Sequence, residues 1–61
     1  MNIYLLTSEI STYVVAARTS EEAKSFVPKD EGKYFWKCIG KSPTIKKPGI
    51  QDRFDLEMAA A

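Results

Sequence analysis

The sequence contains no histidine and a single cysteine, Cys38, among its 61 residues. Without histidine, neither a histidine-based catalytic triad nor a histidine metal site can form. One cysteine cannot form a disulfide within the chain, and we therefore expect a cytoplasmic protein. The three glycines are too scattered along the chain to build a phosphate-binding loop. These absences leave few routes to catalysis, so we expect no enzymatic activity and no cofactor.

The chain also lacks a strong charge of either sign and a long apolar run. Nine lysines and arginines oppose eight acidic residues, which excludes a histone-like polycation and an acidic DNA mimic. No apolar run approaches the roughly 18 residues of a membrane span, and no secretory signal is evident, so we expect no membrane partner. The length allows one domain, which we place at residues 1–58. The final three alanines, 59–61, resemble a cloning scar and form a tail outside it.

Two strands are expected at the start of the chain. Residues 2–7 are almost continuously apolar and β-compatible, and residues 12–17 are rich in valine and other β-formers. The polar residues 8–11 between them are too few for a parallel crossover. The sequence therefore predicts an antiparallel hairpin.

A short helix is expected to follow the hairpin. Thr19-Ser20-Glu21-Glu22 has the pattern of a capping box, in which the first hydroxyl and the last carboxylate each accept a hydrogen bond from the other residue's amide. Pro28 disfavours helical geometry at the residue before it, so the helix should end near residue 27. The stripe that should face the sheet consists of Ala23, Phe26 and Val27.

Residues 29–32 are expected to form a turn, and residues 33–41 a third strand. From residue 50 the apolar residues fit both a strand period and a helix period, and we favour a fourth strand through about residue 56. The fold class expected is α+β. A small antiparallel sheet of three or four strands should carry one short helix on one face, in the order strand, strand, helix, strand, with the fourth strand at the C-terminus.

The middle of the chain is basic and aromatic. Residues 29–47 contain six lysines, two acids and three consecutive aromatic residues. Basic residues interleaved with aromatic rings are typical of single-stranded nucleic-acid binders, and also of a half-buried strand with a solvated face. The strand period divides the third strand into two faces. The first face consists of Tyr34, Trp36, Cys38 and Gly40. We expect this face to lie under the helix, with the tryptophan and the cysteine in the core.

The opposite face of the third strand is the candidate binding surface. Because one short helix can cover only one side of the sheet, apolar residues on the other side must stay exposed or meet a partner. Phe35 and Ile39 would serve as apolar anchors, and the lysines would steer an acidic partner. The alternative is that the lysine stems merely shield two hydrophobes on an ordinary sheet. The proposed contact residues are Lys33, Phe35, Lys37, Ile39 and Lys41.

Several segments resemble a broad class of small bacteriophage and prophage proteins. The chain begins Met-Asn-Ile-Tyr-Leu-Leu-Thr, its second strand runs as Tyr13-Val14-Val15-Ala16-Ala17 into Arg18-Thr19-Ser20-Glu21-Glu22-Ala23, and the third strand carries Trp36-Lys37-Cys38-Ile39-Gly40. The resemblance covers residues 1 to about 50. In element order the chain is also similar to a small phage inhibitor of host RNA polymerase, a likeness that transfers no binding residue.

These observations together predict a non-catalytic function. The resemblance implies a phage or prophage accessory protein that acts in the host cytoplasm. There it would bind and modulate a host protein, such as RNA polymerase or a component of a defence system. One alternative is a small nucleic-acid-binding module that uses the basic segment 29–47. Another is a structural homodimer that closes its sheet on a second copy.

Overall fold

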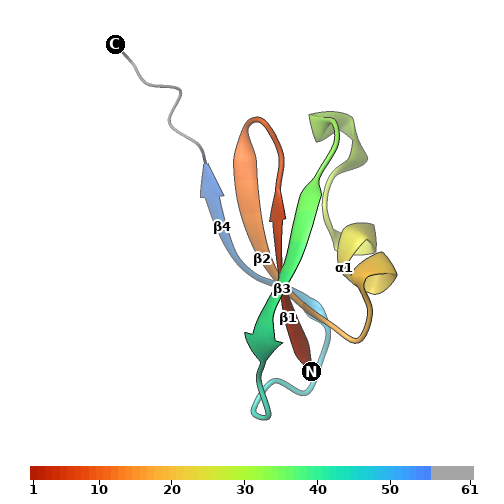
Figure 1. Ribbon diagram of the computed structural model, residues 1–61, viewed down its shortest axis with the longest axis vertical. Coiled ribbons are helices and arrows are strands. Elements are labelled where there is room, and N and C mark those ends of the chain that lie inside the picture. The colour runs from red at the N-terminus through yellow and green to blue at the C-terminus, as the bar shows by residue number, and fades with distance from the viewer. Residues whose placement is uncertain (56–61) are drawn as a thin grey trace.

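The computed structural model describes residues 1–55 of the chain, and the domain end and alanine tail expected at residues 56–61 lie outside the described residues. The described part contains four strands, one α-helix and one short 3₁₀ helix. In chain order these are β1 (Asn2–Thr7), β2 (Ser11–Ala17), α1 (Ser20–Phe26), the 3₁₀ helix η1 (Lys29–Glu31), β3 (Phe35–Lys41) and β4 (Gly49–Asp55) (Figure 1).

The four strands form one antiparallel sheet in the order β3-β1-β2-β4. The hairpin of β1 and β2 occupies the centre, while β3 and β4 are the edges. The connection between the edge strands passes around the end of the sheet at which β1 begins (Figure 1). There Met1 and Ser42 exchange two hydrogen bonds, of 3.0 and 2.8 Å, which extend the pairing of β1 with β3. The predicted α+β class is confirmed.

The hairpin turn is held by two serines at its base. Ser8 donates its amide to the carbonyl of Ser11 at 2.8 Å, and its hydroxyl bonds to the same carbonyl at 3.2 Å. The hydroxyl also accepts from the amides of Ile10 and Ser11. Both serines are buried, so these local bonds satisfy polar groups that would otherwise be costly to remove from water. The second strand consequently begins at Ser11, one residue earlier than predicted.

The start of α1 confirms one half of the capping box. The amide of Glu22 donates to the Thr19 hydroxyl at 3.1 Å, as expected of the N-cap. The Glu22 carboxylate, however, accepts from the amide of Arg18 at 2.8 Å, one residue before the amide predicted for it. At the other end Val27 is already extended, because it precedes Pro28.

The core lies between α1 and the central hairpin. A buried cluster joins the two, and Tyr34 packs at its margin. Helix positions 23 and 27 are buried as predicted, whereas Phe26 is 37% exposed. The cluster consists of Tyr4, Leu6, Tyr13, Val15, Ala17, Ala23 and Val27.

The core positions predicted for the third strand are wrong. Trp36 and Cys38 pair with Leu6 and Tyr4, so they do lie on the side of the sheet that carries the helix. Trp36 is nevertheless 47% exposed, and Cys38 is also exposed. The reason is the strand order, which places β3 at an edge. The strand also begins at Phe35, two residues later than predicted.

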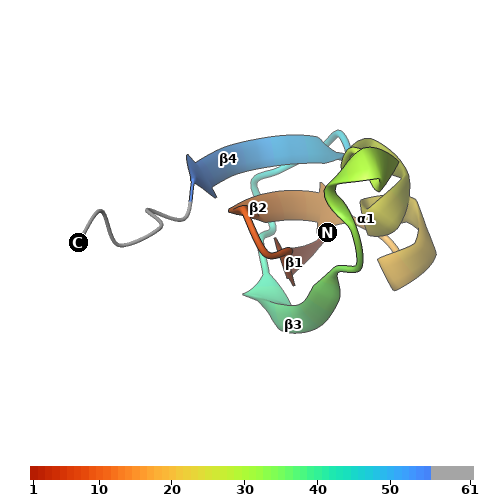
Figure 2. The ribbon, with the colours of Figure 1, turned by 90° about the horizontal axis from the view of Figure 1, so that it is seen from above.

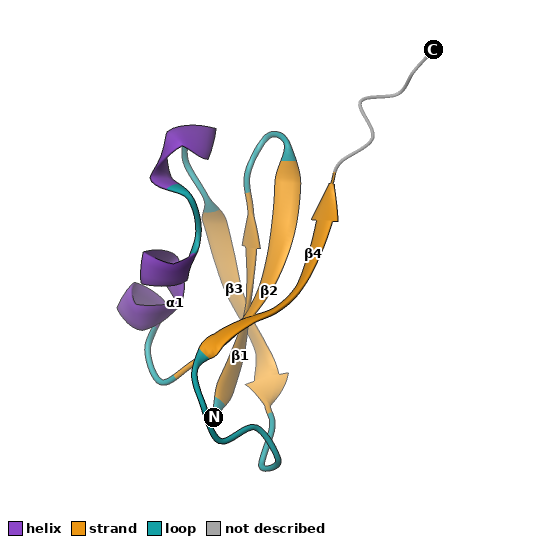
Figure 3. Cartoon of the chain, turned by 180° about the vertical axis from the view of Figure 1, so that it is seen from behind, coloured by secondary structure: helices purple, strands orange, loops and turns teal. Residues whose placement is uncertain are grey.

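Both helical segments lie on the same side of the sheet (Figures 2 and 3). Ala23 and Val27 of α1 pack into the core cluster, and Glu31 of η1 bonds to Ser11 and Tyr13 of β2. Within residues 1–55, the opposite side of the sheet therefore has no helix packed on it. In that same range, no helix is long and apolar enough to cross a membrane.

Candidate functional site

The side of the sheet opposite α1, called here the open face, carries the candidate site. Residues paired directly across an antiparallel sheet point to the same side, so the register identifies its members. Its central positions are only half-buried, apart from Ala16, which is buried near the connection between the edge strands. The paired residues of the open face are Ile3, Leu5, Thr7, Thr12, Val14, Ala16, Phe35, Lys37, Asp52 and Phe54, and alternation along β3 adds Ile39.

Three of the five predicted contact residues belong to this face. Phe35 lies opposite Thr7 and is 80% exposed, the most exposed large hydrophobic residue in the described range. Lys37 lies opposite Leu5 and is exposed. Ile39, two residues further along the strand, is 51% exposed. An aromatic ring, an aliphatic side chain and a lysine are thus brought together along one edge of the open face.

The remaining two predicted residues lie elsewhere. A β-bulge interrupts the pairing of β3, because Tyr4 opposes Cys38 while Ile3 opposes Gly40. The extra residue shifts the alternation, and Gly40 adopts the positive φ of 153° that suits glycine at such a point. Lys41 therefore pairs with Asn2 on the helix side, so the prediction that all five share one face is wrong.

Lys33 precedes β3 and lies outside the sheet. It lines a hollow of about 490 Å³ with Phe35 and with Thr7, Ser8 and Glu9 of the hairpin end. Lys33 thus remains next to the open face at its Phe35 end, although it is not one of the paired positions.

Two residues of the open face were not anticipated from the sequence. Phe54 lies opposite Thr12 and is 54% exposed, and Asp52 lies opposite Val14. The amide of Arg53 donates to the Asp52 carboxylate at 2.8 Å. The strand period of the C-terminal segment was visible in the sequence. What could not be read from it was that β4 would pair with β2, which gives the open face a second aromatic edge.

A second polar cluster lies on the helix side, around Glu31. The Ser11 hydroxyl donates to one carboxylate oxygen at 2.6 Å, and the Tyr13 hydroxyl donates to the other at 3.0 Å. The Nε of Arg53 in turn donates to the Tyr13 hydroxyl at 3.1 Å, and the guanidinium stacks over the Tyr13 ring. Residues of η1, β2 and β4 are thus linked around the Glu31 carboxylate, which the sequence placed in an ordinary turn.

The Glu31 cluster favours the ionised carboxylate. The Ser11 hydrogen bond is the largest cause that lowers the pKa of Glu31, with further lowering by Tyr13 and by the charge of Arg53. Burial raises the pKa of Tyr34 to about 12, and the neighbouring Glu31 charge adds to the shift. The Tyr34 hydroxyl donates to the carbonyl of Pro28 at 2.7 Å. The arrangement fastens η1 to the sheet, which is a structural role.

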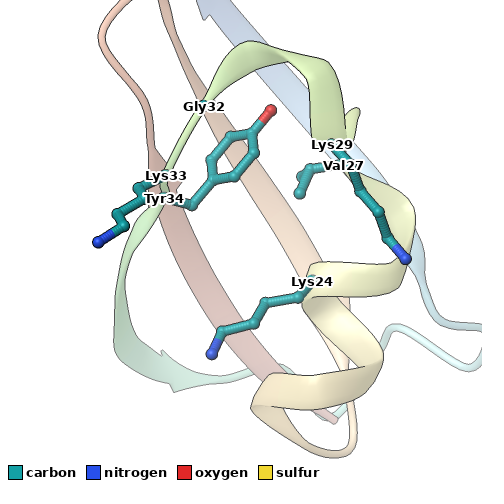
Figure 4. Close-up of a pocket in the computed structure, with 6 residues that line it drawn as sticks. All are labelled: Lys24, Val27, Lys29, Gly32, Lys33 and Tyr34. Carbon is teal, nitrogen blue, oxygen red and sulfur yellow. The ribbon is translucent and has the colours of Figure 1, made fainter.

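A hollow of about 290 Å³ lies between α1, η1 and the start of β3 (Figure 4). Val27 and the Tyr34 ring line it, together with three lysines, Lys24, Lys29 and Lys33. The lysine side chains extend in different directions, so their ammonium groups do not converge on one point (Figure 4). Lys24 instead places its Nζ 5.6 Å from the centre of the Trp36 ring.

Residues 1–55 contain no cluster of three or more metal-ligating side chains. Cys38 is exposed on an edge strand, and its Sγ lies 3.7 Å from the carbonyl of Gly40. The open face combines exposed aromatic rings with two charged residues, Lys37 and Asp52.

Comparison with known protein families, with curated proteins and with solved structures found no match to this chain. The resemblance to small bacteriophage and prophage proteins therefore stays a prediction from the sequence.

Proposed function

We propose that this chain is a non-catalytic protein that works by binding another protein through its open face. The observation that carries this proposal is the exposure of Phe35, Ile39 and Phe54 on the one side of the sheet that has no helix. Their exposed fractions are 80%, 51% and 54%. Exposed apolar surface of this kind on a small protein commonly marks an interaction site.

The arrangement of side chains on the open face supports this reading. Aromatic rings stand at both edges with half-buried Thr7 and Thr12 between them, and half-buried Leu5 and Val14 lie in the neighbouring row. Large rings supply most of the binding energy in protein interfaces, and charges at the rim set orientation and partner choice. Lys37 and Asp52 are the charged residues on this face.

The partner class suggested by the sequence is a host protein of a phage or prophage, such as RNA polymerase or a defence protein. This identity rests on the resemblance alone, and it remains part of the proposal. The host cytoplasm as the site of action is also part of the proposal. The same holds for the modulation of the partner.

Nucleic-acid binding by the basic segment is supported less well. The rings and lysines of residues 29–47 are divided between the two sides of the sheet: Phe35 and Lys37 lie on the open face, Trp36 and Lys41 on the other. A single strand of nucleic acid is usually tracked by one continuous groove with stacking rings along it. The division of these residues therefore favours a protein partner.

The test is the double variant Phe35→Ser with Ile39→Thr. A matched control makes the same two changes at exposed residues outside the open face, Phe26→Ser with Ile10→Thr. Each tagged protein is used to capture partners from a bacterial lysate, its mass in solution is measured, and its fold is checked by circular dichroism. We expect wild type and control to bind a stoichiometric protein or a second copy, and the open-face variant to remain folded without binding either.

Two results would contradict the proposal. If the open-face variant unfolds, Phe35 and Ile39 belong to the core and the surface is wrongly placed. If wild type captures no protein and also remains a monomer at every concentration, the open face is not a binding surface.

A further inference from the structure

The open face has a regular order that its exposure alone does not reveal. The pairing of the four strands arranges its side chains in rows that run across the sheet from β3 to β4. One row reads Phe35, Thr7, Thr12 and Phe54. The next row reads Lys37, Leu5, Val14 and Asp52.

The ends of the first row are alike, and the ends of the second row carry opposite charges. The first has an aromatic ring at both edges and a threonine at both centres. The second has a lysine at one edge and an aspartate at the other, with aliphatic residues between them. The two charged groups are three strand spacings apart, about 14 Å, so they cannot pair within one chain. Asp52 bonds to the neighbouring backbone amide, and Lys37 is exposed.

A second copy placed face to face would satisfy both rows at once. A two-fold axis parallel to the strands, midway between the sheets, sets β3 of one copy over β4 of the other and β1 over β2. Lys37 then faces Asp52 of the second copy, and Phe35 faces its Phe54. Because the axis is two-fold, each contact occurs twice, as in other isologous interfaces. Aligned sheets pack about 10 Å apart and are rotated by about 30°, a shift that a flexible lysine can follow.

The charges disfavour the other face-to-face arrangement when its axis passes through the Lys37 and Asp52 row. A two-fold axis perpendicular to the strands would set β3 over β3 and β4 over β4. With the rows in register, Lys37 would then face Lys37, and Asp52 would face Asp52. Like charges brought together across an interface are unfavourable, whereas the axis parallel to the strands pairs Lys37 with Asp52 twice, so the distribution of charge favours it.

We propose that the partner of the open face is a second copy of this chain, packed face to face about a two-fold axis parallel to the strands. This inference rests on the proposed function, because it needs the open face to be a binding surface. A face only four strands wide gives an interface at the small end of the usual range. The association should therefore be a monomer–dimer equilibrium that depends on concentration.

The experiment uses two charge reversals, Lys37→Glu and Asp52→Lys, measured alone and mixed, by sedimentation equilibrium on the full chain. Wild type should rise from 6.9 kDa towards twice that mass as concentration increases. Each reversal alone places like charges opposite each other twice and should raise the dimer dissociation constant at least about tenfold. In an equimolar mixture both contacts become attractive again, so heterodimers should form with an affinity near that of wild type.

Two matched reversals outside the open face, Lys41→Glu and Asp30→Lys, should dimerise as wild type does. Circular dichroism must show that every variant is folded. If either reversal does not fold, the neutral changes Lys37→Gln and Asp52→Asn take its place, and each should weaken the dimer by a smaller factor.

The outcomes separate this inference from the proposed function. The inference is overturned if wild type stays monomeric, if the single reversals dimerise unimpaired, or if the mixture fails to associate. Should wild type stay monomeric while Phe35→Ser with Ile39→Thr loses a protein captured from lysate, the open face binds a different protein and only the second copy is excluded. If neither form of binding is seen, both proposals fail.

Discussion

The central strands and the edge strands of this small sheet differ sharply in burial. Each of β1 and β2 carries buried residues, and β2 buries five of its seven. In β3 every residue is exposed, and in β4 every residue but the first. β3 is nearly as rich in apolar side chains as the central strands, so composition does not explain its exposure, whereas β4 has only Ile50 and Phe54 as apolar side chains. Position in the sheet does, because α1 covers the central strands and leaves the edge strands exposed.

The physical reason is the size of the helix. A helix is about 10 Å across with its side chains, and neighbouring strands lie about 4.8 Å apart, so one helix covers roughly two strands. Here the seven residues of α1 pack mainly on the hairpin. The edges extend beyond this cover, and their aromatic residues keep about half or more of their surface in contact with solvent.

The largest effect should come from the centre of the hairpin. Leu6 is fully buried, and Leu6→Ala should lower the free energy of unfolding by about 2–5 kcal/mol. A domain of this size has only about 3–5 kcal/mol in total, so the variant should be largely unfolded. Urea denaturation of Phe35→Ala, at concentrations where the chain is monomeric, is the matched comparison and should give a change within about 0.5 kcal/mol. Equal losses of unfolding free energy in Leu6→Ala and Phe35→Ala would contradict the difference in burial between the central and edge strands.

Trp36→Ala tests the boundary between the two regions. The ring meets Tyr4 edge-to-face at 5.8 Å and lies near Lys24, although 47% of the residue is exposed. Such aromatic and cation–π contacts contribute about 0.5–1.5 kcal/mol each, so we expect a loss of about 1–2 kcal/mol in chemical denaturation. A loss of about 3–5 kcal/mol is the value expected for a core tryptophan. It would show that Trp36 is more buried in solution than its 47% exposure indicates.

The smallest effect should be a dependence of the folding stability on acid pH. It arises at Glu31, which bonds to β2 in the centre of the sheet, next to Arg53 of the edge strand β4. The pKa of Glu31 is lowered below its ordinary 4.5, chiefly by the Ser11 hydrogen bond. A lowered folded-state pKa gives stability that is present above pH 4.5 and is lost as the pH falls through the folded-state value. Thermal unfolding from about pH 7 to about pH 3 should therefore show a steeper acid loss for wild type than for Glu31→Gln. Parallel curves would mean that the cluster does not hold the ionised form.

Much of the fold could be predicted because its signals are local. The short polar loop between two β-rich segments required an antiparallel hairpin, and Thr19 and Pro28 marked the ends of the helix. The alternation after residue 50 favoured a strand, and β4 confirms it as far as Asp55. Each of these features depends on residues within a few positions of one another.

The candidate site could be predicted only in part. Period two correctly separated Phe35 and Lys37 from Trp36 and Cys38. It could not locate the bulge after Cys38, which moves Lys41 to the other side, because a bulge depends on the partner strand. Nor could it bring Phe54 and Asp52 into the site, since nothing near them in the chain indicates that their strand pairs with β2.

The sequence determines the elements of this protein, because hydrogen bonding in turns, helix capping and side-chain periodicity act over a few neighbouring residues. Strand order was settled by folding in three dimensions, since many pairings satisfy the same local preferences and only packing selects among them. That order leaves Trp36 half-exposed at an edge and brings Ser11 within hydrogen-bond distance of Glu31. It also places a lysine and an aspartate at opposite ends of one row, because residues far apart in the chain become neighbours only once the strands are arranged.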